Sequence, residues 1–280
     1  MPTNGYKLPR ELAGTVLGGI VASKMRELAE ARKKLPEEAM RMASDRWPVV
    51  RSLKRALKGK IPAVIAEIKP ASPSAGVLRA DVNPIALAKE YQDGGAAALS
   101  VITESLYFRG WLESVSSVRW NARLPILRKD FIVDSYQLTE TRHAGGDAVL
   151  LIAALLEGGR LRDLRQEAEA LGMDALVEVH DEHELDRALE AGASLIGVNN
   201  RDLKTLEVSL EVALNLAPRL SPGVVAVAES GIRDGEDLRR LWASGYRGFL
   251  VGESLMRSAS PGKALEGLLA GFRGTGLKAS

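Results

Sequence analysis

One pattern repeats along the chain from Pro62 onward, and it constrains the fold more than any other feature. A short aliphatic or β-branched run is followed by a polar residue, an amphipathic helical segment and a glycine, after which the next run begins. The run interiors are almost continuously apolar, as expected of parallel strands that are buried on both faces. The runs span residues 63–69, 98–104, 125–131, 147–153, 174–180, 195–200, 224–230 and 248–254.

Eight such runs alternating with helices predict an α/β protein with a closed (β/α)8 barrel, the TIM-barrel architecture. An open doubly wound sheet is the alternative. It would normally carry a G-x-G-x-x-G fingerprint after its first strand, which the segment AVIAEIKPASPSAG lacks. We expect residues 1–280 to form a single barrel domain, in which residues 1–60 are an N-terminal helical extension flanking the barrel mouth.

Polar residues and glycines mark where the helices between the runs begin and end. Asp134 and Asp234 are expected N-caps, as is Asn83, which precedes a proline. A glycine shortly before a run is expected to end the preceding helix in the left-handed conformation. The glycines in these positions are Gly95, Gly146, Gly172, Gly192 and Gly245.

The composition excludes several kinds of site. The chain has no cysteine, which rules out disulfides, thiolate metal sites and a cysteine nucleophile. Only three histidines are present, at His143, His180 and His183. We expect His180 and His183 to be solvated residues at a helix start rather than metal ligands, and therefore predict no metal site.

Neither a membrane span nor a secretion signal is expected. The sequence has no stretch of 18 uncharged apolar residues, which a spanning helix requires. The segment MPTNGYKLPRELAG lacks the apolar core of a signal peptide. A cytoplasmic location is therefore expected.

The net charge of +2 is unevenly distributed. Residues 1–62 contain 14 Lys and Arg against 6 Asp and Glu, a balance of +8, so the rest of the chain has a balance of −6. A nucleic-acid arm is one interpretation, but aromatic residues are not interleaved with the basic ones. We expect instead a packed amphipathic helix with a solvated basic face, and no nucleic-acid partner.

Charged residues stand at or near the ends of several runs. In a (β/α)8 barrel the chemistry lies at the carboxyl ends of the strands, which meet at one mouth. Glu67 and Lys69 lie two residues apart and share one strand face, and Lys129 lies near the end of the third run. Glu178 and Glu229 lie inside apolar runs. Each could simply mark where the chain meets water, but together they are costly to hold unless they pair or act. The set predicts acid–base chemistry.

The last two loops predict a phosphate site. Barrels of this kind often bind phosphate after strands seven and eight, through backbone N–H groups and a short helix N-terminus. Here those loops read AESGI and VGESLM, and ordinary tight turns are the alternative interpretation. Ser72 in the first loop adds a hydroxyl. The expected phosphate-binding residues are Ser72, Ser230, Gly231, Gly252 and Glu253.

Apolar residues near the mouth predict a wall for a flat aromatic ligand. Phe108 follows the second run, Phe131 ends the third and Leu150 lies in the fourth. Packing in the core is the competing interpretation. The polar residue Asn199 lies near the end of the sixth run, and Arg201 follows that run.

The motifs together resemble those of indole-3-glycerol phosphate synthase, the ring-closing enzyme of tryptophan biosynthesis. The resemblance covers about residues 60–258 and is carried by IAEIKPASPSAG, SVITESLYFRG, LRKDFIVDSYQ, LVEVH, IGVNNRDL, AESGI and VGESLM. AESGI and VGESLM are common in phosphate-binding barrels, whereas LRKDF combined with AEIKPASPS is specific. One departure is Pro70-Ala71, where some relatives carry another basic residue, so anion contacts there are expected to be fewer.

The resemblance implies a lyase, specifically a carboxy-lyase, that needs no cofactor or metal. Its substrate would be a sugar phosphate, 1-(2-carboxyphenylamino)-1-deoxyribulose 5-phosphate, which undergoes ring closure, decarboxylation and dehydration. A monomer is expected, with a non-covalent pathway partner possible.

The resemblance also implies residue roles. Lys129 matches the general acid, Lys69 the counter-charge of the substrate carboxylate, and Glu178 the proton-transferring carboxylate of the dehydration. Glu67, Asn199 and Glu229 would hold the lysines and the substrate hydroxyls. The expected substrate-binding residues are Ser72, Phe108, Phe131, Leu150, Arg201 and Ser230.

Two other functions remain open on the sequence. Another phosphosugar barrel, such as phosphoribosylanthranilate isomerase, is one, although such isomerases generally use a Cys or an Asp pair and this chain lacks Cys. A non-catalytic barrel that binds a phosphorylated ligand is the other. Such a barrel would not need Lys69, Lys129 and Glu178 together at its mouth.

Overall fold

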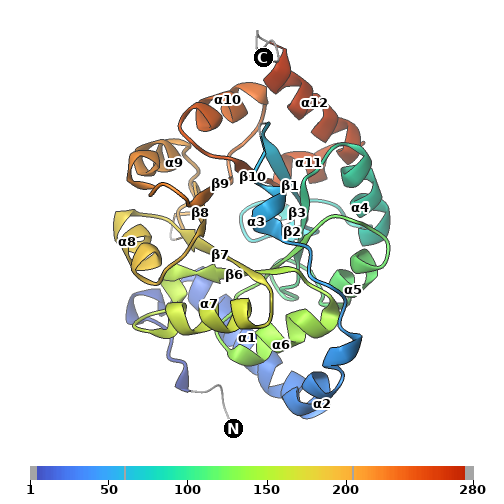
Figure 1. Ribbon diagram of the computed structural model, residues 1–280, viewed down its shortest axis with the longest axis vertical. Helices are drawn as coiled ribbons and strands as arrows, with labels where there is room; N and C mark the ends of the chain where they lie inside the picture. The colour runs from blue at the N-terminus through green and yellow to red at the C-terminus, as the bar shows by residue number, and fades with distance from the viewer. Residues whose placement is uncertain (1–4, 60, 204, 275–280) are drawn as a thin grey trace.

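Parallel strands close into an eight-stranded barrel in the computed structural model of the chain, which describes residues 5–59, 61–203 and 205–274 (Figure 1). Around the barrel the strands follow the order β1-β10-β9-β8-β7-β6-β5-β4, and β1 pairs with both β4 and β10. Each predicted run contains one of these strands, which confirms the (β/α)8 barrel. They are β1 Ala63–Ile68, β4 Ala98–Ile102, β5 Ile126–Lys129, β6 Ala148–Ile152, β7 Asp174–Val179, β8 Leu195–Asn199, β9 Val225–Glu229 and β10 Gly248–Val251.

Helices alternate with the strands and form the outer ring in Figure 1. They are α4 Pro84–Asp93, α5 Glu113–Arg119, α6 Ser135–Ala144, α7 Arg160–Ala170, α8 Glu182–Glu190, α9 Glu211–Leu216, α10 Gly235–Ala243, α11 Glu253–Arg257 and α12 Pro261–Arg273. Short 3-10 turns follow β6 and α9, at η4 Ala153–Leu155 and η5 Ala217–Arg219. The loop after β1 contains a small antiparallel hairpin of β2 Ala71–Ser72 and β3 Gly76–Val77.

The predicted N-caps are confirmed. Asn83 Oδ1 accepts hydrogen bonds from the backbone N–H of residues 85 and 86, and Asp234 caps α10 in the same way. Asp134 forms a capping box at the start of α6. Gly95, Gly172, Gly192 and Gly245 have positive φ, as expected of residues that end helices.

The prediction for Gly146 is wrong by one residue. The left-handed residue after α6 is Gly145, with φ of 88°, because the helix already ends at Ala144. Gly146 is required for a different reason. A Cβ atom there would lie 2.5 Å from Thr141 Cγ2, so its backbone packs directly against the last turn of the helix.

The N-terminal extension contacts both ends of the barrel. It contains η2 Arg10–Leu12, α1 Val16–Lys34, α2 Glu37–Met42, η3 Ser44–Arg46 and α3 Leu53–Ala56, while residues 1–4 and 60 of the expected extension lie outside the described residues. In Figure 1, α3 lies over the centre of the barrel, and α1 passes behind α6 and α7. Side chains of α1 line the cavity at the carboxyl ends of the strands. The extension thus spans the barrel from one end to the other.

No helix in the described part of the chain is both long enough and apolar enough to cross a membrane.

Asp147 connects three segments at the end of the barrel where the strands begin. Its buried carboxylate accepts hydrogen bonds from the backbone N–H of Arg51 at 2.8 Å and of Ile126 at 2.9 Å. The same carboxylate forms an ion pair at 2.8 Å with Arg119, which is itself buried. One side chain therefore joins the extension, β5 and α5.

We predict that Asp147→Ala lowers the free energy of unfolding by about 3–5 kcal/mol, because it leaves a buried arginine unpaired. Urea denaturation followed by circular dichroism measures the change. Asp163→Ala is the matched control, since its carboxylate is 69% exposed, and it should stay within about 0.5 kcal/mol of the wild type. If both variants unfold at the wild-type midpoint, Asp147 does not fasten the barrel.

Candidate active site

A cavity of about 710 Å³ opens at the carboxyl ends of the barrel strands. The strand ends and the loops that follow them supply most of its lining, and α1 adds apolar side chains at one side. Every site residue predicted from the sequence lies in this lining. They are Glu67, Lys69, Ser72, Phe108, Lys129, Phe131, Leu150, Glu178, Asn199, Arg201, Glu229, Ser230, Gly231, Gly252 and Glu253.

Lys129 occupies the centre of the charged cluster. It is the last residue of β5, and its Nζ lies 3.6 Å from Glu178 Oε2 on β7 and 3.7 Å from Glu229 Oε2 on β9. These are ion-pair distances, too long for good hydrogen bonds. Burial alone would lower the pKa of Lys129, but Glu178, Glu229 and Glu67 together raise it. The lysine is therefore an ammonium ion at neutral pH.

The two glutamates beside Lys129 have opposite protonation states at neutral pH. Burial opposes the ionisation of Glu178, but the charges of Lys129 and His180 outweigh burial and lower its pKa to about 2. Burial also opposes the ionisation of Glu229, and the negative charge of Glu178 adds to it, so the pKa of Glu229 rises to about 8. At neutral pH Glu178 is therefore an ionised carboxylate, whereas Glu229 carries a proton.

Glu67 and Lys69 form a second ion pair in the same cavity. Glu67 on β1 is buried and lies 2.9 Å from Lys69 Nζ, and Ser100 Oγ on β4 donates to Glu67 at 3.4 Å. Burial raises the pKa of Glu67, but Lys69 and Lys129 lower it below its ordinary value. The two lysines and the two ionised glutamates balance one another in charge.

Two glycines make room for the buried glutamates. A Cβ on Gly197 of β8 would lie 2.1 Å from Glu229 Oε1, and a Cβ on Gly252 would lie 2.5 Å from Glu67 Oε1. Any side chain at either position would displace a carboxylate. Sequence reasoning missed Gly197, whose only signal is a glycine inside an apolar run.

The loops after β9 and β10 bring bare backbone to the cavity. Ser230 and Gly231 both have positive φ, at 65° and 80°, and a Cβ on Gly231 would lie 2.8 Å from a side-chain atom of Val208. Gly252 immediately precedes α11 and leaves the first turn of that helix open to the cavity. Such loops present N–H groups to an anion.

Polar side chains connect the loops that surround one side of the cavity. Asn199 Oδ1, at the end of β8, accepts hydrogen bonds from Ser230 Oγ at 2.8 Å and from the Arg201 backbone at 3.1 Å. The Arg201 guanidinium donates to Ser74 Oγ in the first loop at 3.1 Å and lies 3.5 Å from Glu253. These bonds link the loops after β1, β8, β9 and β10.

The predicted aromatic pair is present. The rings of Phe108 and Phe131 lie 6.0 Å apart at 41°, and both line the cavity together with Leu150. Glu104 holds the loop that carries Phe108, because its carboxylate accepts the backbone N–H groups of residues 106, 107 and 108 at 2.7–3.1 Å. A buried charge, which the sequence did not single out, thus sets the position of the ring.

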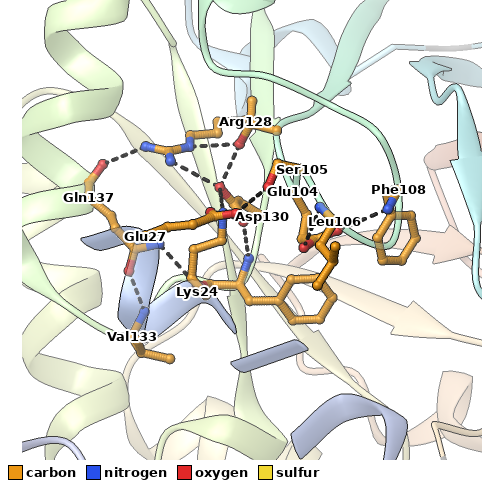
Figure 2. A network of polar contacts seen from close by, with 12 residues as sticks. Lys24, Glu27, Glu104, Ser105, Leu106, Phe108, Arg128, Asp130, Val133 and Gln137 are labelled. Atoms are coloured by element: carbon orange, nitrogen blue, oxygen red, sulfur yellow. Dashed lines mark hydrogen bonds and ion pairs between the residues drawn. The ribbon is translucent and has the colours of Figure 1, made fainter. Parts of the chain in front are cut away.

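Figure 2 shows how α1 reaches the strand ends through Lys24. Lys24 is buried, and its ammonium group lies 3.1 Å from Asp130 and 2.6 Å from Glu27. Asp130 also pairs with Arg128 at 2.9 Å and accepts a hydrogen bond from Thr103 at 2.6 Å. Because Asp130 follows Lys129 directly, this network fixes the end of β5. The sequence prediction did not include Lys24.

The prediction for His180 is wrong. Its side chain is only 12% exposed, and it lies 3.3 Å from Glu178 Oε1 and 3.0 Å from Glu184 Oε2. Burial opposes the protonation of this imidazole, but the two carboxylates raise its pKa to about 10. His183 is exposed on α8, as predicted. The difference arises because His180 follows β7 at the barrel mouth, whereas His183 lies on the outer surface.

Within the described residues, no three His, Cys, Asp or Glu side chains are placed to hold a metal ion together. The expectation that no metal or cofactor takes part stays a prediction.

Comparisons with known proteins agree with the sequence motifs. A family model described as indole-3-glycerol phosphate synthase matches residues 17–268. The indole-3-glycerol phosphate synthase of Carboxydothermus hydrogenoformans is 50% identical over 262 residues, covering 90% of this chain and 98% of that protein. The one from Albidiferax ferrireducens is 48% identical, covering 91% and 98%.

A solved structure shares the fold at low identity. Thiamine phosphate pyrophosphorylase from Pyrococcus furiosus superposes with a TM-score of 0.58 at 18% identity, covering 78% of this chain and 96% of that one. At this identity the similarity shows the barrel fold alone.

We predict that one buried glutamate carboxyl, that of Glu229, titrates near pH 8, protonated below this pH and ionised above it. Carbon-13 NMR of glutamate-labelled protein measures the midpoint. The signal should vanish in Glu229→Gln and persist in Glu266→Gln, which changes an exposed residue. If every glutamate titrates below pH 6, the assignment of a proton to Glu229 is incorrect.

Proposed function

The chain belongs to the indole-3-glycerol phosphate synthase family, and we propose that its mouth cavity carries out the family's reaction with the residue roles given below. The observation that carries this proposal is the placement of Lys129 between Glu178 and Glu229, with the ion pair of Glu67 and Lys69 in the same cavity. This arrangement offers one substrate an ammonium group that can donate a proton, a carboxylate that can accept one, and a second ammonium group that can bind a carboxylate.

The substrate is 1-(2-carboxyphenylamino)-1-deoxyribulose 5-phosphate. The ring carbon that bears the carboxylate bonds to the ketone carbon, and the ketone oxygen takes a proton to become a hydroxyl. The carboxylate leaves as CO₂ and its bonding electrons return to the ring. The hydroxyl then leaves as water, and a proton is lost from the former sugar carbon next to nitrogen. The product is indole-3-glycerol phosphate, and the chemistry is that of a carboxy-lyase.

Lys129 is the general acid in this proposal. Its surrounding carboxylates keep it an ammonium ion, and neither is close enough to bind it tightly, so its protons can turn toward the ketone oxygen. Lys69 lies in the same cavity and provides the counter-charge for the substrate carboxylate until CO₂ leaves. Glu178, ionised at neutral pH, takes the proton during dehydration. Glu67, Asn199 and Glu229 hold the lysines and the substrate hydroxyls.

The remaining lining residues bind the two ends of the substrate. Phe108, Phe131 and Leu150 pack against the aromatic ring. Ser72, Ser230, Gly231 and Gly252 bind the phosphate together with the backbone N–H of Glu253. The carboxylate of Glu253 would repel a phosphate, but it pairs with Arg257 at 3.2 Å and lies 3.5 Å from Arg201. Arg201 supports the polar groups of the substrate.

We also propose that residues 1–280 act as one barrel domain, as a cytoplasmic monomer without metal or cofactor. The small sugar phosphate is the only ligand that this mechanism requires, because the lysines and glutamates of the cavity donate or accept every proton that the reaction moves. A non-covalent partner from tryptophan biosynthesis is compatible with this proposal.

A direct assay tests the activity. The purified chain is mixed with the substrate in the absence of metal and nucleotide. It should form CO₂ and the indole product, which is measured by its fluorescence, in equal amounts. A folded protein that binds the substrate or inorganic phosphate but forms neither product would retain the anion site and refute the synthase activity.

We predict that Lys129→Ala lowers kcat by about 10²–10⁴-fold with a modest change in KM, because it removes the general acid. Steady-state kinetics with the same substrate measures both constants. Lys89→Ala, which removes an exposed lysine on α4, is the control and should match the wild type. Near-normal turnover in Lys129→Ala would exclude the general-acid role.

A further inference from the structure

Lys129 by itself does not decide which of its two glutamates is ionised. Its ammonium group lies at nearly equal distances, 3.6 Å and 3.7 Å, from Glu178 and Glu229, and both carboxyl groups are buried. Two buried carboxyl groups that share one cation do not both ionise readily, so one of them keeps a proton at neutral pH. Some other group must therefore break the symmetry between them.

His180 touches only one of the two glutamates. Its Nε2 is buried and lies 3.3 Å from Glu178 Oε1, without the geometry of a directed hydrogen bond. Glu178 therefore lies between two cations, with Lys129 near Oε2 and His180 near Oε1. By contrast, Glu229 has only Lys129 as an ion-pair partner among the described residues. Neither oxygen of Glu229 accepts a hydrogen bond there, and neither does Glu178 Oε2.

Glu184 fixes the imidazole from the other side. Its Oε2 lies 3.0 Å from His180 Nδ1 and accepts the backbone N–H of His180 at 2.9 Å. Glu184 itself is held in the first turn of α8, where its backbone N–H donates to the N-cap Asp181 at 2.8 Å. One carboxylate thus sets both the ring and the backbone of His180, and the two nitrogens of the ring face two negative charges.

Few charged groups surround His180, Glu178 and Glu229. His180 faces Glu178 on β7 and Glu184 on α8. Glu178 faces Lys129 on β5 as well as His180. Glu229 faces Glu178, Lys129 and Glu67 on β1, of which only the lysine favours its ionised form. The row Glu184–His180–Glu178–Lys129 alternates in sign from the surface helix to the cavity.

We propose that His180 is a positioning residue that aims the Glu178 carboxylate and favours its ionised form beside the lysine. Glu184 acts through His180 by fixing the ring. The effect on catalysis rests on the proposed function, because there Glu178 takes a proton and must be ionised to do so.

Removing the imidazolium should make Glu178 easier to protonate. An opposite charge within about 4–6 Å changes a carboxyl pKa by roughly 1–3 units. Without His180, the pKa of Glu178 therefore rises from about 2 to about 3–5, which is still below the pKa of Glu229. The base then becomes protonated in mildly acidic solution, at a higher pH than in the wild type, and it stays ionised at pH 7.

His180→Asn tests the proposal directly. We expect kcat to stay within about twofold of the wild type at pH 7 and to fall by up to about tenfold at pH 4, a smaller loss than the 10²–10⁴-fold expected from removing an acid–base group itself. KM should stay within about twofold. The acidic limb of the kcat profile should move up by about 1–3 pH units, and most of kcat should return by pH 7. His183→Asn, an exposed histidine on the same helix, should leave the profile unchanged.

Glu184→Gln provides a second variant in case His180→Asn does not fold, which a thermal melt reveals. It should shift the acidic limb in the same direction by a smaller amount. In the His180→Asn background it should add nothing, because Glu184 acts only through the imidazole. A separate effect of Glu184→Gln in that background would overturn its assigned role.

Glutamate carbon-13 NMR gives a readout that does not depend on turnover. In the wild type one buried glutamate should titrate near pH 8, and in His180→Asn this midpoint should not fall, while the midpoint of Glu178 should rise by about 1–3 units. An unchanged midpoint of Glu178 would refute the proposal, as would a kcat loss that is equal at every pH. If the wild type itself forms no product, the proposed function fails, and the NMR titration alone still decides the role of His180.

Discussion

The buried ion pairs around Lys129 govern the arrangement of the rest of the site. An ammonium group and three carboxyl groups lie where four strands of the barrel end, a place in which an unpaired charge would be strongly destabilising. Gly197 and Gly252 give the carboxylates space by leaving bare backbone beside them. The charged side chains can stay buried only because strands from across the barrel bring compensating charges to within 4 Å.

The N-terminal extension supports this cluster from outside the barrel. Lys24 of α1 binds Asp130, the residue after Lys129, so the strand end that carries the general acid is fixed by a helix more than 100 positions earlier in the sequence. At the opposite end, Asp147 binds the backbone that leads into α3. The extension therefore restrains both the catalytic end and the end where the strands begin.

Unequal surroundings give similar side chains different tasks. Glu178 and Glu229 stand at equivalent positions near the ends of β7 and β9, and both approach the same lysine. One meets a second cation and the other meets further carboxyl groups, so their pKa values move apart to about 2 and about 8. Such a separation lets a proton acceptor and a proton donor operate side by side at one pH.

The sequence by itself determined the barrel fold and which residues form the site. Continuous apolar runs at regular intervals fit only strands buried on both faces, and parallel strands place the residues at their carboxyl ends around one mouth, so Lys69, Lys129 and Glu178 could be brought together without coordinates. The N-caps at Asn83, Asp134 and Asp234 follow from local chemistry in the same way.

Only the tertiary structure decided which glutamate holds the proton, why most of the His180 side chain is shielded from water and what Lys24 binds. These properties depend on distances between groups far apart in the chain, and on how much water each group loses. Neither quantity is encoded by neighbours in the sequence, since charge interactions act through space and burial is set by the closed barrel as a whole.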